Sequence, residues 1–155
     1  MTDQTLATRI GEIVTAHLAL EGPLLPILHA VQAEYGHVPQ AALPVIALGL
    51  NLTRAEVHGV MSFYHDFREE PAGRHVVKLC RAEACQAMGA NGLADHARSR
   101  LGVDWGGTTS GGAVTLEAVY CLGLCACAPA AIVDGQVVGR LDADRFDALV
   151  AECGA

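Results

Sequence analysis

Residues 121–130 read CLGLCACAPA, and residues 80–90 read CRAEACQAMGA. Together they hold five of the six cysteines in the chain: Cys80, Cys85, Cys121, Cys125 and Cys127. Each stretch follows a run that reads as a β-strand, at residues 75–79 and at residues 114–120. If these runs are neighbouring strands of one sheet, both groups of cysteines leave the sheet at the same edge. The pattern therefore predicts a four-thiolate site, and thiolates are soft ligands that select zinc or iron–sulfur clusters.

Several kinds of site could explain this spacing of cysteines. Cysteine is often a small buried residue with no ligand, but five cysteines at two strand ends are poorly explained in that way. Zinc knuckles favour C-x2-C, and the C-x4-C at residues 80–85 is wider, although wider zinc spacings occur. The C-x-x-C of dithiol oxidoreductases is absent. The bacterial ferredoxin run is also absent, and Met88 stands where a plant-type ferredoxin has its third cysteine.

The composition provides ample material for a core. Of the 155 residues, 52% are hydrophobic and 17% are charged, which argues against disorder. The formal net charge is −7 and lysines and arginines do not cluster, so no nucleic-acid partner is expected. No basic and apolar leader opens the sequence and no apolar run reaches the length of a membrane span, so we expect a cytoplasmic protein without membrane insertion. In that compartment, cysteines serve metal or redox chemistry more often than structural disulfides.

The first 70 residues read as helices. Apolar residues recur at helical spacing in residues 6–18, 24–36 and 39–51. Thr53 and Glu56 then form a capping-box pattern that predicts the start of a fourth helix. This region carries no constellation of titratable side chains, so docking to another protein is its expected use.

Three aromatic residues close the helical region: Phe63, Tyr64 and Phe67. We expect them to pack between the helical region and the rest of the chain. Any of them that is exposed would instead mark a subunit interface.

After residues 71–73 the pattern changes to an α/β plan. The expected elements are a strand at 75–79, a helix at 91–101, a strand at 114–120, a hairpin at 131–138 and a helix at 142–152. An Asp-Gly pair predicts the hairpin turn, and Asp142 is the expected N-cap of the last helix. The glycine-rich GGTTSGG at 106–112 invites a phosphate-loop interpretation, but a strand follows it instead of a helix. A flexible turn is the better interpretation.

The cysteine spacing is specific enough to suggest a family. A C-x4-C at residues 80–85, then 35 residues, then a C-x3-C at residues 121–125 resembles the thioredoxin-like 2Fe–2S ferredoxins. EYGHVP (34–39) and EVHGVMSFYHDF (56–67) are similar to the helical extension of the small iron–sulfur subunit in the NADH-oxidising module of respiratory complex I. The two cysteine stretches most resemble the γ subunit of soluble, NAD-dependent, molybdenum-containing formate dehydrogenases. NAD-reducing hydrogenases carry a related subunit.

The resemblance implies a fold and a set of ligands. Residues 1–70 would be a helical extension used in docking, and residues 71–155 a thioredoxin-like 2Fe–2S domain. One 2Fe–2S cluster would be held by Cys80, Cys85, Cys121 and Cys125. Cys127 and Cys153 have no place in the motif. Lys78 and Arg81 would offset the negative charge of the cluster, with Glu83 opposing them.

The resemblance also implies a function. The chain would pass single electrons as one subunit of a formate dehydrogenase complex, with no turnover by itself. Its partners would be an iron–sulfur subunit that carries FMN and the NAD site, and a catalytic subunit that contains molybdenum. The corresponding subunit of an NAD-reducing hydrogenase or of complex I is the alternative. A zinc-stabilised interaction module is the alternative without redox chemistry.

Overall fold

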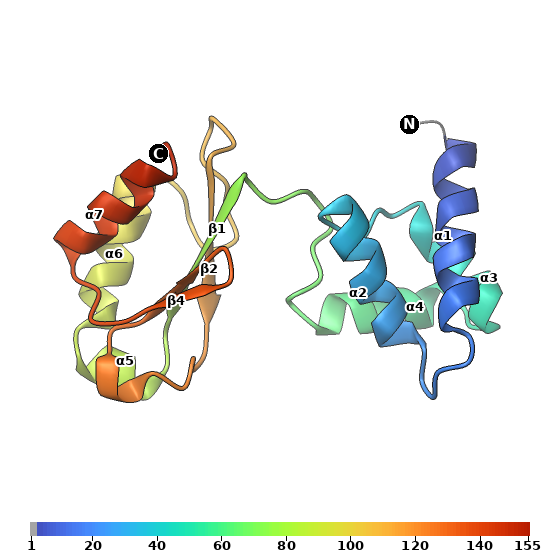
Figure 1. Ribbon diagram of the computed structural model, residues 1–155, viewed down its shortest axis with the longest axis horizontal. Coiled ribbons are helices and arrows are strands. Elements are labelled where there is room, and N and C mark those ends of the chain that lie inside the picture. Colours follow the sequence, from blue (N-terminus) through green and yellow to red (C-terminus); the bar gives the residue numbers. More distant parts are fainter. Residues whose placement is uncertain (1–2) are drawn as a thin grey trace. The chain divides into compact units, whose positions relative to one another are not determined.

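The computed structural model describes residues 3–155. The chain forms two compact units, one that ends at Pro71 and one that begins at Ala72 (Figure 1). Each unit has a hydrophobic core of its own. Among the described residues, no helix has the length and apolar character needed to cross a membrane.

The first unit is helical, as the apolar spacing predicts. Its elements are α1 (Asp3–His17), α2 (Leu24–Tyr35), α3 (Ala42–Leu50) and α4 (Arg54–Phe63). The left-handed residues Gly36 (φ 75°) and Asn51 (φ 54°) end α2 and α3. At α4 both bonds of the expected capping box are present, between Thr53 and Glu56. The core side chains of this unit include Ile10, Val14, Ile27, Leu28, Val31, Leu43, Ile46, Val57 and Met61.

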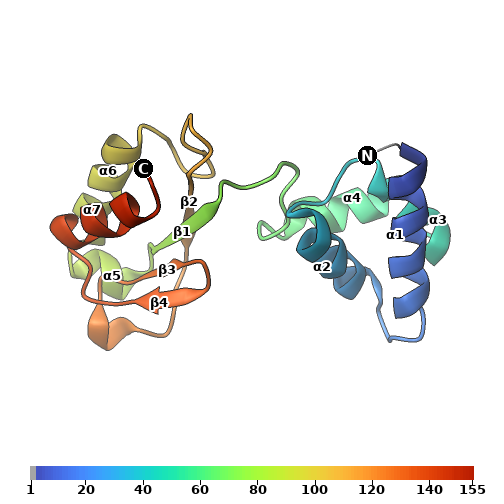
Figure 2. The same cartoon turned by 45° about the horizontal axis from the view of Figure 1, so that its top comes forward.

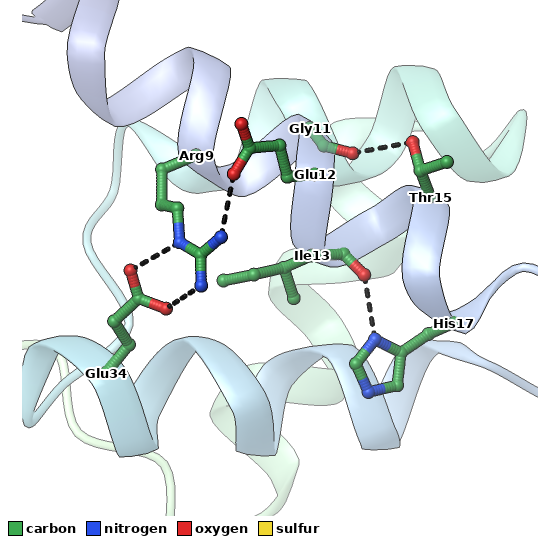
Figure 3. A network of polar contacts seen from close by, with 7 residues as sticks. All are labelled: Arg9, Gly11, Glu12, Ile13, Thr15, His17 and Glu34. Atoms are coloured by element: carbon green, nitrogen blue, oxygen red, sulfur yellow. Dashed lines mark hydrogen bonds and ion pairs between the residues drawn. The ribbon is translucent and has the colours of Figure 1, made fainter.

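An exposed polar network joins α1 to α2 above that core (Figure 3). The Arg9 guanidinium donates from Nε and Nη2 to the two carboxylate oxygens of Glu34, at 2.7 and 2.9 Å, and from Nη1 to Glu12 at 2.7 Å. The hydrogen bond from Arg9 holds the pKa of the Glu34 carboxyl below its usual value. The network links α1 to α2 on the surface, and exposed ion pairs of this kind contribute little stability.

The aromatic residues of the first unit divide into two groups. Phe67 is buried in the helical core and its ring lies 4.8 Å from the ring of His29. Phe63 and Tyr64 are exposed, at 73% and 45% of their surface. The expectation that Phe67 packs between two parts of the chain is therefore wrong: Phe67 belongs to the core of the helical unit.

The second unit is built on a four-stranded sheet with the strand order β2-β1-β3-β4. The strands are β1 (His75–Cys80), β2 (Val114–Val119), β3 (Ala131–Val133) and β4 (Gln136–Val138). The pair β1 and β2 is parallel, and β3 is antiparallel to both β1 and β4. The turn between β3 and β4 is the expected one: Asp134 (φ 49°) and Gly135 (φ 85°) both have positive φ, as a two-residue hairpin requires.

Two helices cover one face of this sheet (Figures 1 and 2). They are α6 (Ala90–Leu101) and α7 (Ala143–Glu152), and Asp142 caps α7 by accepting a hydrogen bond from the Arg145 N–H. Side chains from both helices share a single core with the sheet. That core includes Val77, Leu79, Leu93, Ala97, Val114, Leu116, Phe146 and Val150.

The segment GGTTSGG folds back against β2. The N–H of Gly106 bonds the carbonyl of Leu116, and the N–H of Thr109 bonds that of Val114, at 2.8 and 2.9 Å. The Thr109 hydroxyl accepts from the N–H groups of Ala113 and Val114. These hydrogen bonds hold the segment as a turn against β2.

Candidate functional site

The two cysteine loops leave the same edge of the sheet. Cys80 is the last residue of β1 and stands in register with Val119, the last residue of β2. Cys121 follows two residues later. Because β1 and β2 are parallel neighbours, the ends of both strands carry thiols to one place, as the sequence predicts.

The structure forms the first pair of thiols from β1 and a short helix. Cys85 lies in α5 (Glu83–Ala87), and its thiol is near enough to that of Cys80 for each to shift the pKa of the other. Both side chains are buried, with 2% and 3% of their surface exposed. Around them lie mostly small residues, which are Ala82, Ala90, Ala128 and Ala130.

The second pair of thiols lies on the exposed loop after β2. Cys121 and Cys125 are both exposed, and the Cys121 thiol is near enough to raise the pKa of Cys125. Cys121 has φ 79°, a left-handed backbone conformation that residues other than glycine rarely adopt. Gly123 (φ 73°) turns the loop between them. Strained backbone of this kind often marks a functional site.

Backbone N–H groups favour the charged form of the Cys80 sulfur. Burial alone would raise the pKa of the Cys80 thiol. Its polar neighbours outweigh this effect and lower that pKa below its usual value; they are the N–H of Ala82, the Cys85 thiol and the N–H groups of Cys121 and Leu122. For Cys85, burial and the neighbouring Cys80 raise the pKa of the thiol. Hydrogen bonds from backbone to sulfur are what a negatively charged cluster needs around its ligands.

Cys125 is influenced by both groups of thiols. The neighbouring Cys121 thiol raises its pKa, and the charge of Cys80 adds to the same effect. The two pairs are therefore near enough to interact electrostatically across the end of the sheet. Within residues 3–155, however, no group of three His, Cys, Asp or Glu side chains converges as ligands of one metal ion.

The other two cysteines lie elsewhere. Cys127 closes the short 3-10 helix η1 (Cys125–Cys127), and its carbonyl accepts a hydrogen bond from the Arg140 N–H at 2.6 Å. Its Cβ packs so closely against Gly139 that a Cβ on that glycine would stand 2.7 Å away. Cys153 is buried in the core formed by the sheet with α6 and α7.

The donor set fits a binuclear cluster. In a 2Fe–2S cluster, four cysteine thiolates bind two irons, so each iron takes one pair. A structural zinc ion instead draws its four ligands to one point. Two thiol pairs with backbone donors on the buried sulfurs match the first requirement.

Sequence reasoning named Arg81 but missed Gln86 and Asn91, which bind it in the first cysteine loop. Gln86 donates to the carbonyl of Arg81 at 2.7 Å, Asn91 donates to Gln86 at 3.4 Å, and Arg81 donates to Asn91 at 3.0 Å. These residues are five apart in sequence, a spacing that signals no motif. Only the fold of the loop brings them together.

Fold and site together define a ferredoxin of the thioredoxin-like class. The sequence pattern of the family described as "Thioredoxin-like [2Fe-2S] ferredoxin" matches residues 10–154. The chain belongs to this family.

Individual relatives are components of NAD-linked complexes. The chain is 39% identical over 127 residues to one component of the NADH-quinone oxidoreductase of Rhizobium meliloti, covering 82% of this chain and 76% of that protein. It is 30% identical over 145 residues to the HoxS alpha subunit of the NAD-reducing hydrogenase of Cupriavidus necator, covering 94% of this chain and 24% of that protein. The crystal structure of an air-oxidised NAD+-reducing [NiFe]-hydrogenase superposes with a TM-score of 0.71 at 27% identity, over 84% of this chain and 22% of that one. The chain thus spans most of the first relative and about a quarter of each hydrogenase chain.

Proposed function

We propose that the chain is an electron-transfer subunit that binds one 2Fe–2S cluster through Cys80, Cys85, Cys121 and Cys125. The observation that carries the proposal is the meeting of two thiol pairs at the common end of two parallel strands, in a chain of the 2Fe–2S family. The cluster, when bound, takes up and releases one electron at a time.

The two cysteine pairs have different roles at this site. The buried Cys80 and Cys85 pair anchors one side of the cluster away from water, and backbone N–H groups offset the negative charge that reduction adds. The exposed Cys121 and Cys125 pair presents the other side. A redox partner that docks over this loop would bring its own centre close to the cluster.

The finer proposal is a place in an NAD-dependent formate dehydrogenase. The relatives named as components of NADH-quinone oxidoreductase and of NAD-reducing hydrogenase support an NAD-linked complex. The choice of formate dehydrogenase depends on the two cysteine stretches alone. In that complex, the partners are an iron–sulfur subunit with FMN and the NAD site and a catalytic subunit with molybdenum, and the location is cytoplasmic.

Affinity purification of the tagged chain from its native host tests this choice. We expect the purified complex to contain flavin and molybdenum and to reduce NAD with formate. Recovery of nickel and activity with hydrogen, or of the other components of a quinone reductase, would contradict the formate dehydrogenase proposal while leaving the electron-transfer role intact.

The helical unit offers an apolar surface for docking. A groove on this unit is lined by Leu24, Leu52, Val60 and Tyr64, with Phe63 beside them. Phe63 exposes 73% of its surface and continues the apolar lining of this groove, and a contiguous apolar patch of this kind marks an interaction site. We therefore assign this groove to the flavin-carrying subunit.

A further inference from the structure

Arg81 is a cation held in place on the loop that begins directly after the proposed ligand Cys80. It follows Cys80 directly in the chain, and its Nη2 donates to the Asn91 side chain at 3.0 Å. Its guanidinium carbon lies 5.3 Å from the centre of the Trp105 ring, which is a cation–π distance. Its Nε is buried and has no hydrogen-bond partner.

The loop around Arg81 restrains this side chain. The carbonyl of Arg81 accepts from Gln86, and Gln86 accepts from Asn91, which in turn accepts from the Arg81 guanidinium. This closed circuit ties the loop after β1 to α5 and α6. With Trp105 beneath it, the guanidinium cannot move away from the site without breaking several contacts at once.

The charge of Arg81 also differs from the charges of Lys78 and Arg100. Lys78 is paired with Glu117 at 3.2 Å, and Arg100 with Asp147 at 3.7 Å. Each of these charges is largely offset by its own carboxylate. Arg81 forms no ion pair within residues 3–155, and its described partners, an amide and an aromatic ring, carry no net charge.

We propose that Arg81 is a positioning residue that raises the reduction potential of the cluster held by Cys80 and its partners. This inference rests on the proposed function. Reduction adds one negative charge to the cluster, and a fixed positive charge nearby stabilises the reduced form more than the oxidised form. Because Arg81 is partly buried and unpaired, solvent and salt screen it less than an exposed cation.

Midpoint potentials of the full-length chain, measured by electron-spin resonance during a redox titration, test the proposal. Arg81→Gln should favour the oxidised form by about tenfold, which equals a fall of about 59 mV for a one-electron couple. Arg81→Lys keeps the charge and should lose less than half of that shift. Arg100→Gln is the control: it removes a paired positive charge about 13 Å beyond Asn91 along α6 and should leave the potential unchanged.

A second variant keeps the test decisive if Arg81→Gln fails to hold iron. Asn91→Asp is nearly isosteric, lies on the exposed first turn of α6, and would neutralise Arg81 with a carboxylate. It too should lower the potential. Two outcomes would overturn this inference and leave the proposed function standing. One is an intact cluster with an unchanged potential in Asn91→Asp. The other is an equal shift of the potential in Arg81→Gln and Arg81→Lys. A wild-type chain that binds no 2Fe–2S cluster overturns the proposed function as well.

Discussion

At the scale of single residues, the geometry separates Cys127 from the other cysteines of its loop. Cys125 interacts with Cys121 and Cys80, whereas Cys127 packs against Gly139. Two residues of separation in a 3-10 turn are enough to direct the two side chains differently. We therefore leave Cys127 outside the proposed set of ligands.

Serine substitutions test this division. We expect Cys80→Ser, Cys85→Ser, Cys121→Ser and Cys125→Ser each to lose or severely perturb the cluster, because serine replaces a soft thiolate ligand. Cys127→Ser and Cys153→Ser should keep the iron content and the electron-spin signal, with at most a shifted potential. The assignment is wrong if Cys127→Ser empties the site while Cys125→Ser leaves iron and spectrum unchanged.

The close contact between Gly139 and Cys127 gives a second prediction at this scale. A Cβ on Gly139 would stand 2.7 Å from the Cys127 Cβ and 2.9 Å from its carbonyl oxygen, so Gly139→Ala must displace η1 and Cys125 with it. Overpacking of this kind costs about 1–3 kcal/mol. We expect faster bleaching of the cluster by an iron chelator. Gly111→Ala in the same unit meets no atom within 4 Å and is the control; equal bleaching rates in the two variants would refute the packing argument.

At the scale of elements, the sequence was most informative where local chemistry decides the structure. Asp134-Gly135 predicted the hairpin turn, Asp142 the cap of α7, and the position of Cys80 and Cys121 after two strand-like runs predicted a common edge. The five-residue α5 and the three-residue η1 were not predicted. Such short helices have too few residues to show a period, and tertiary contacts around the cysteines determine them.

The capping box of α4 leads to a pH prediction. The Glu56 carboxylate accepts from the Thr53 N–H at 2.7 Å, and this hydrogen bond, with the one from the Thr53 hydroxyl, lowers the pKa of Glu56 below its usual value. The cap is thus fully formed above the ordinary glutamate pKa of about 4.3 and is lost as pH falls through the lower folded value.

Nuclear magnetic resonance can follow this titration at the Thr53 amide in the full chain. We expect the amide shift to change with a midpoint clearly below a pH of about 4.3. In Glu56→Gln the transition should disappear, since the amide side chain does not ionise. A midpoint at or above the ordinary glutamate value would contradict the hydrogen-bonded cap.

At the scale of the whole molecule, the chain combines an electron-carrier unit with a helical unit that has its own core. From the sequence, the exposure of Phe63 could be stated only as a condition. Whether an aromatic residue is exposed depends on how helices that are distant in sequence pack together. The structure buries Phe67 and exposes Phe63, although both are phenylalanines in one short segment.

A charge placed in the groove tests docking. Phe63→Asp should keep the fold, because the side chain is exposed, but should abolish co-purification with the flavin-carrying subunit through the cost of burying a carboxylate. Leu48→Asp is the matched control, since Leu48 exposes 85% of its surface on the same unit outside the groove. The docking role fails if Phe63→Asp and Leu48→Asp retain the partner equally well.

The central claim is that this chain holds a two-iron, four-thiolate cluster. The most direct measurement combines metal and acid-labile sulfide analysis of the anaerobically purified, full-length chain with its electron-spin resonance after reduction by dithionite. The account predicts iron and sulfide in equal amounts, about two of each per chain, and a single S = 1/2 signal of about one spin per chain. A colourless protein that carries about one zinc per chain, without sulfide and without a signal on reduction, would contradict it.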